Sequence, residues 1–143
     1  LNLPCSVLAE KEGYRSLGNA VAMLGAYQAD GVFVLRSWAT SNSDVLVKYL
    51  QAIIEGYRWA ADPAHRDEAA AITANILKLD PDVAAKANDI AAGPKGGLAK
   101  DARFDMEGFK NTLKLRAEMD GGNAAQPKKY LDLSYYEKAL AGL

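Results

Sequence analysis

The longest amphipathic pattern in the chain lies between residues 46 and 57. Apolar side chains recur there at spacings of three and four, which predicts an α-helix with one buried face. Asn42, Ser43 or Asp44 can cap its start, and Asp62-Pro63 ends it. The expected apolar face consists of Leu46, Tyr49, Leu50, Ile53, Ile54 and Tyr57.

Two more helices are predicted in the alanine-rich stretch that follows. The first covers about residues 64–77, and the second opens at Asp80-Pro81, because Asp can cap a helix and Pro is preorganised for its first turn. A loop from Gly93 to Gly97, with Pro94 inside it, comes next. The expected inner faces are Ala69, Ile72 and Ile76 in the first helix and Val83, Ala87 and Ile90 in the second.

Further helices are predicted towards both ends of the chain. Residues 7–11 form a short helix-compatible stretch. Asp105 can cap a longer helix that ends at Gly121-Gly122. Ser134 and Glu137 have the spacing of a capping box, which predicts a last helix ending near Leu143. The face expected in the longer helix is Met106, Phe109, Leu113 and Arg116.

Two segments have the composition of β-strands. Residues 32–35 are Val-Phe-Val-Leu, and Asp30-Gly31 forms a turn before them. Such a continuous apolar run suits a strand buried on both faces, and residues 14–18 form a second short candidate. The predicted fold class is therefore α/β and helix-rich, with few strands and about five helices. Two short strands cannot form a stable sheet alone, so further strands must come from a missing part of the protein or from a second copy.

The composition and net charge of the chain exclude several classes of function. The 143 residues are 50% hydrophobic and 24% charged, with a formal net charge of −1. This balance is typical of one globular domain, and it excludes bulk attraction to nucleic acid or to an anionic membrane. No apolar run is long enough to span a bilayer. The chain starts at Leu1 inside a segment predicted to be structured, which indicates a processed or truncated piece.

Catalytic and metal-binding patterns are weak. Cys5 is the single cysteine and has no histidine nearby in sequence, so a small buried residue or a pocket wall is favoured over a nucleophile. His65 is the single histidine and is expected to be a solvated first-turn residue. No catalytic residue, metal site or cofactor is predicted. Tyr27, Phe33 and Trp38 lie at predicted strand ends and loops, where they line a ligand cleft or pack in the core.

The order of segments resembles the C-terminal half of the substrate-binding proteins of ABC importers, in the group of nitrate, sulfonate, taurine and thiamine-pyrimidine binders. No single motif is specific, but their order and spacing cover nearly the whole chain. Cys5 departs from the family pattern, in which a second Pro or a small polar residue is frequent. The stretches that carry the resemblance are Leu3-Pro4 with residues 13–17, residues 27–38 with Asn42 and residues 44–46, residues 57–63, residues 105–109, and residues 129–136.

The resemblance implies a two-lobed periplasmic-binding-protein type II fold. In that fold residues 1–26 would be the end of the second lobe and the hinge crossing, and residues 27–143 the C-terminal part of the first lobe. The implied function is a solute-binding component that captures a small molecule between its lobes and delivers it to an ABC permease. The implied location is periplasmic, after export, with no nucleic-acid partner. The ligand-binding candidates are Pro4, Cys5, Ser6, Tyr27 and Trp38.

Two other interpretations stay open. The chain is a small helical interaction module that dimerises through its exposed strand at residues 32–35, or it pairs with a missing N-terminal half. Alternatively it is an enzyme, since the resembled group includes a thiamine-pyrimidine synthase that uses its own histidine, which points to His65. The lone histidine lies far from any nucleophile or metal pattern, so we expect no enzymatic activity.

Overall fold

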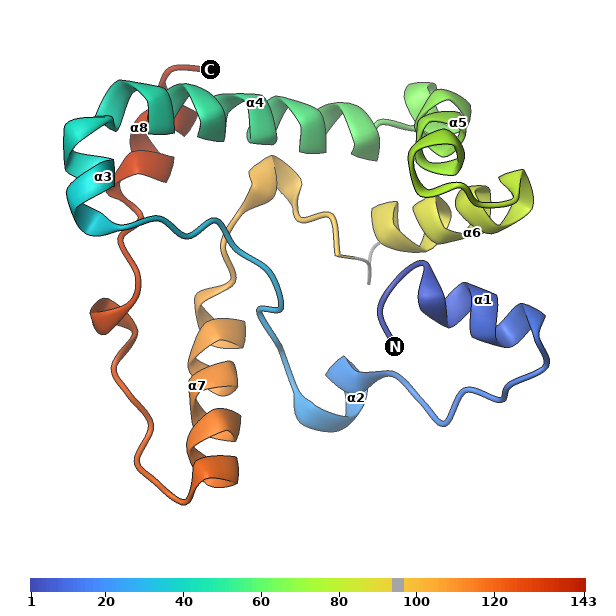
Figure 1. The fold of residues 1–143 in the computed structure, drawn as a ribbon, viewed down its shortest axis with the longest axis horizontal. Coiled ribbons are helices and arrows are strands. Elements are labelled where there is room, and N and C mark those ends of the chain that lie inside the picture. Colours follow the sequence, from blue (N-terminus) through green and yellow to red (C-terminus); the bar gives the residue numbers. More distant parts are fainter. Residues whose placement is uncertain (94–96) are drawn as a thin grey trace. The chain divides into compact units, whose positions relative to one another are not determined.

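The computed structural model describes residues 1–93 and 97–143, and within them every regular element is a helix (Figure 1). Pro94 and the two residues after it in the predicted glycine-rich loop lie outside the described residues. The α-helices are α1 Cys5–Lys11, α2 Ala20–Leu24, α3 Arg36–Ser41, α4 Ser43–Ala61, α5 Arg66–Leu77, α6 Pro81–Ala92, α7 Met106–Asp120 and α8 Ser134–Ala141. Short 3₁₀ turns are η1 Pro63–His65, η2 Lys100–Ala102 and η3 Pro127–Lys129.

The predicted α/β fold class is wrong for the described residues, because they contain no strand and no sheet. Residues 14–18 and 32–35 both lie outside regular structure. The physical reason is that a strand exists only as one side of a hydrogen-bonded ladder. Among the described residues neither segment shares such a ladder with another segment, so its β-forming composition is not satisfied by a partner strand.

The helix predictions are confirmed in position. The middle helix is α4, and Asp62 ends it as predicted while its side chain caps η1 through the amide of Ala64 at 2.9 Å. Asp105 caps α7 by accepting from the amide of Gly108 at 3.0 Å, and Gly121 closes that helix in the left-handed region at φ 69°.

The predicted capping box of the last helix is wrong. The amide of Ser134 donates to Oδ1 of Asp132 at 3.0 Å, so Asp132 supplies the cap-like carboxylate and Ser134 is already helical. The hydrogen bonds from the side chain and amide of Ser134 hold the pKa of Asp132 below its usual range. The carboxylate of Asp132, two residues before the serine, therefore accepts the amide hydrogen bond that was expected to go to Glu137.

The chain divides into two compact units. The first comprises Leu1–Leu17 and Ile53–Ala102, and the second comprises Gly18–Ala52 and Arg103–Leu143. The helix α4 contributes residues to both.

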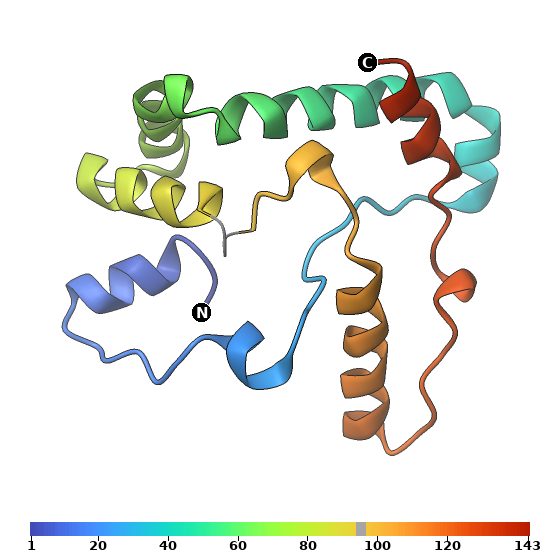
Figure 2. The same ribbon diagram turned by 180° about the vertical axis from the view of Figure 1, so that it is seen from behind.

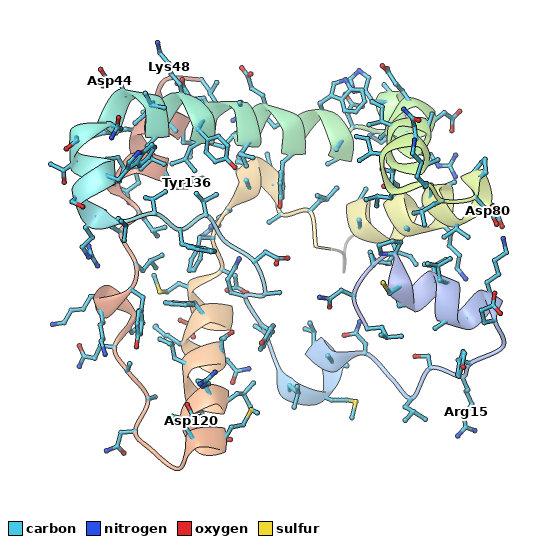
Figure 3. All side chains as sticks on the ribbon, in the orientation of Figure 1. Arg15, Asp44, Lys48, Asp80, Asp120 and Tyr136 are labelled. Atoms are coloured by element: carbon cyan, nitrogen blue, oxygen red, sulfur yellow. The ribbon has the colours of Figure 1, made fainter. Side chains whose placement is uncertain are left out.

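The first unit has its core where α1 packs against α6. Val7, Val83 and Ala87 are buried together, and Leu3 and Leu79 pack against them. At the surface of the same contact, Nζ of Lys11 lies 2.7 Å from a carboxylate oxygen of Asp80, which Figure 3 labels at the start of α6. These contacts use the predicted inner residues Val83 and Ala87, whereas Ile90 on the same helix is 45% exposed.

The packing of α5 on α6 uses a different face from the predicted one. Ala69 is buried, but Ile72 and Ile76 are exposed. Two residues of α5 bond to α6: Arg66 pairs with Asp89, and the hydroxyl of Thr73 lies 3.2 Å from Oδ1 of Asn88. The buried residues of α5 are the small Ala69 and Ala70, whereas its two isoleucines remain exposed.

Lowering the pH is expected to remove the stabilisation from the pair of Arg66 and Asp89. Two hydrogen bonds of 2.7 Å from the guanidinium, together with its charge, hold the pKa of Asp89 below its ordinary value of 3.8. A carboxyl whose pKa falls on folding stabilises the folded state above its unfolded pKa and loses that contribution as the pH falls through the folded value. Both side chains are about half exposed, so the effect is small and is screened by salt.

Urea unfolding of Asp89→Asn and of the wild type at several pH values checks this expectation. The variant should unfold at lower urea concentration at pH 7 and at the same concentration near pH 2. Asp67→Asn is the control, because the Asp67 carboxylate, also paired with Arg66, is 93% exposed. If the difference in unfolding urea concentration between Asp89→Asn and the wild type grows below pH 4, the Asp89 carboxylate does not stabilise the fold through Arg66.

The second unit is held together through α7 and its contacts with the chain between α2 and α3. Its buried residues are small or aliphatic: Ala39, Leu46, Gly108 and Ala139. Gln51 of α4 donates to the carbonyl of Ala139 in α8 at 3.3 Å, and Phe104 meets Phe109 edge-on at 5.3 Å between ring centroids.

Candidate functional site

The backbone around Tyr27 is fixed by side chains of α7. Nδ2 of Asn111 donates to the carbonyls of Leu24 and Ala26, at 2.7 and 2.8 Å. The hydroxyl of Thr112 donates to the carbonyl of Gln28 at 3.3 Å, although its shorter bond is to the carbonyl of Gly108 within α7. The residues on either side of Tyr27 are therefore held, while Tyr27 itself is 46% exposed.

Gln28 links this loop to the start of α7 as well. Its Oε1 accepts from the amide of Asp105 at 2.9 Å, and its own backbone nitrogen lies close enough to Gly108 to exclude any side chain there. Sequence reasoning missed Gln28, Asn111 and Thr112, since polar residues at such separations carry no local signal. Only the tertiary contact shows that they position Tyr27.

Trp38 lies in α3, at the other end of the extended segment that leaves the Tyr27 loop. Its carbonyl accepts from both the amide and the side-chain amide of Asn42, each at 2.9 Å, which closes α3. Trp38 is 41% exposed. Tyr27 and Trp38 thus both lie in the second unit.

The remaining candidates lie at the start of α1, in the first unit. Pro4 precedes the helix and is half-buried, and the peptide bond from Leu3 to Pro4 is cis. Cys5 is exposed, so the expectation of a small buried residue is wrong. The amide of Ser6 donates to the carbonyl of Asn2 at 3.0 Å. This stretch turns the chain into α1 and carries no charged side chain.

Two open depressions in the described surface lie away from these candidates. One of about 380 Å³ lies at the corner between α3 and α4, and one of about 550 Å³ lies between α5 and α6. The first is lined by Thr40, Ser41, Asn42, Ser43, Asp44 and Val45. The second is lined by Asp67, Ala70, Ala71, Ala74, Asn75, Leu79, Pro81 and Ala85. Both are open surface features without convergent charged groups.

His65 packs in the corner between α4 and α5. Its ring stacks on Trp59 with centroids 4.7 Å apart, and its Nδ1 lies 3.2 Å from the carbonyl of Trp59. This placement differs from the solvated first-turn residue that the sequence suggested. Across residues 1–93 and 97–143, no three of the His, Cys, Asp and Glu side chains are grouped closely enough to hold a metal ion.

Comparison with family models, with curated proteins and with solved structures found no match. In the part of the chain that the structure describes, no helix has the length and apolar character needed to cross a bilayer.

Proposed function

We propose that this chain contributes to the solute-binding component of an ABC importer and takes a small molecule at Tyr27 and Trp38. The order of sequence segments that resembles this group carries the proposal. In support of it, both rings are about half exposed, and the backbone on which each is mounted is held by hydrogen bonds from Asn111, Thr112 and Asn42.

Half-exposed rings on a fixed backbone suit the recognition of a flat or compact solute. An aromatic face can stack on a heterocycle, and a held backbone reduces the ordering cost of binding. The chemistry required is capture and release, and it needs no bond to be broken. The delivery partner under this proposal is a permease in the inner membrane, and the component would act in the periplasm.

Binding by this chain is expected to be weak. Tight sites bury most of the surface of a small ligand, whereas each of these rings covers one side of a solute only. We expect millimolar affinity for an aminopyrimidine, and weaker binding of taurine and nitrate, which lack a ring to stack. Titration of ¹⁵N-labelled protein with each probe, followed by chemical-shift changes, measures this.

The two tryptophans make the titration internally controlled. The indole N–H signal of Trp38 should shift, while that of Trp59, stacked on His65, should not. Tyr27→Ala should reduce the shift, and Tyr14→Ala, an exposed tyrosine of the first unit, should leave it unchanged. Shifts confined to Trp59, or none with any of the three probes, would refute the site. Submicromolar binding would contradict an open site of this kind.

The reading frame upstream of Leu1 tests the importer assignment independently of the ligand. An exported solute-binding component predicts that the frame continues for roughly another domain length and begins with a signal peptide. A start codon within a few residues of Leu1 would count against it.

A further inference from the structure

Residues 31–35 lie outside every helix, and the backbone groups of residues 31–34 are unpaired among the described residues. They run between α2 and α3 as an uninterrupted coil in both views of the ribbon (Figures 1 and 2). Leu35 has φ −66° and ψ 138°, and its carbonyl accepts the first bond of α3 from Ala39 at 2.9 Å. Residues 31–34 make no hydrogen bond with any other described residue. A row of free N–H and C=O groups is a template for pairing with another extended chain.

The side chains of this segment alternate in exposure. Phe33 and Leu35 are 94% and 76% exposed, whereas Val32 and Val34 are 48% and 44% exposed. Successive side chains of an extended chain point to opposite sides, so Phe33 and Leu35 share the outer side. The segment therefore offers free backbone groups and an uncovered apolar face together.

The sequence of the segment is complementary to itself when two copies run antiparallel. With Phe33 opposite Phe33 of a second copy, Val32 lies opposite Val34, and Asp30 lies opposite Arg36. Opposite charges directly across a ladder stabilise it, and the dimer would contain this pair at both ends. In a parallel arrangement Asp30 would face Asp30 and Arg36 would face Arg36, which is destabilising.

Asp30 and Arg36 both have hydrogen-bonding capacity left for an ion pair with a second copy. The Asp30 carboxylate has no partner among the described residues. Arg36 gives one hydrogen bond of 3.1 Å to the carbonyl of Lys129, which leaves other guanidinium donors for a carboxylate. The net charge of −1 per chain also opposes association only weakly.

We propose that the chain associates with a second copy by antiparallel pairing of residues 30–36 about Phe33. The backbone ladder supplies the pairing, the Phe33 and Leu35 side chains supply apolar contact, and the Asp30–Arg36 pairs set direction and register. A two-stranded ladder this short is marginal alone, so the dimer is weak and depends on protein concentration. This inference is independent of the proposed solute binding.

Sedimentation velocity on the full chain, from micromolar to millimolar concentration, tests the association. The wild type should shift from monomer to dimer over this range. Phe33→Asp should weaken dimerisation by roughly tenfold or more, because it places two carboxylates at the centre of the ladder. Leu17→Asp is the matched control, since Leu17 is 86% exposed and lies outside the segment, and it should dimerise like the wild type. A chain that stays monomeric at millimolar concentration, or a dimer that Phe33→Asp leaves intact, overturns the proposal.

Charge exchange tests the direction of pairing. Asp30→Arg should weaken self-association, because it places two arginines opposite one another at each end. Arg36→Asp should do the same with two carboxylates, and an equimolar mixture of the two variants should form a heterodimer in which both pairs are restored. The double exchange should recover the wild-type dimer. Arg36 is the first residue of α3, so circular dichroism must show unchanged helix content in each variant. If Arg36→Asp loses helix, the direction of pairing is tested with Asp30→Arg alone. Dimerisation of Asp30→Arg as strong as that of the wild type would overturn the antiparallel register.

Discussion

Val83→Asp is expected to unfold the first unit under conditions in which the wild type is folded. Val83 is 1% exposed and lies in the contact of α1 with α6, between Val7 and Ala87. An aspartate there would place an unpaired carboxylate among apolar side chains. Leaving a buried charge uncompensated costs about 3–5 kcal/mol, which is a large part of the stability of a domain this size.

Ile90→Asp is the matched control for this substitution. It introduces the same charge on the same helix, but Ile90 is 45% exposed, so the carboxylate can stay hydrated. We expect it to change the free energy of unfolding by less than about 1 kcal/mol. Urea unfolding followed by Trp59 fluorescence, with Trp38 replaced by Phe, reports on the first unit, because Trp59 lies in it. Similar effects of the two substitutions would mean that α1 does not cover Val83.

Gly108→Ala is expected to destabilise the second unit, although alanine is the better helix former. A Cβ at this position would lie 2.8 Å from the backbone nitrogen of Gln28 and 2.7 Å from Oδ2 of Asp105. The Gln28 backbone cannot retreat freely, because its side chain holds the amide of Asp105 and its carbonyl bonds to Thr112. Overpacking of this kind costs about 1–3 kcal/mol.

Gly56→Ala is the control that shows the effect of helix propensity alone, without a close contact to another segment. Gly56 lies in α4 and a Cβ there meets no atom within 4 Å. The helical preference for alanine should therefore stabilise this variant by about 0.5–1 kcal/mol. Thermal unfolding of both variants should give opposite signs, and a stabilising Gly108→Ala would show that the Tyr27 loop is not held against α7. Because that loop carries Tyr27, the destabilised variant should also lose the solute response of Trp38 and Tyr27.

The positions of α1 and of α4 to α8 were predictable because their signals are local, whereas α2 and α3 were not predicted, although the Asn19 side chain caps α2. The Asp62-Pro63 stop, the Asp105 cap and the Gly121 terminus each act through atoms a few residues apart. The candidate site was predictable only in part. Tyr27 and Trp38 were identified from the chain, but Asn111, which holds the Tyr27 loop from more than eighty residues away, was not. A hydrogen bond to a distant carbonyl leaves no pattern in the sequence.

The sequence by itself determined the approximate positions of α1 and of α4 to α8, the apolar character of residues 32–35 and the near balance of charge, but it predicted neither α2 nor α3. The tertiary structure decided what each apolar residue meets. It buried Ala70 and exposed Ile76 on α5, and it left Phe33 uncovered where a doubly buried strand was expected. The physical reason is the difference between short-range and long-range interactions along the sequence. Caps and helical periodicity depend on neighbours along the chain, whereas burial and β-pairing depend on a surface that some other segment must provide.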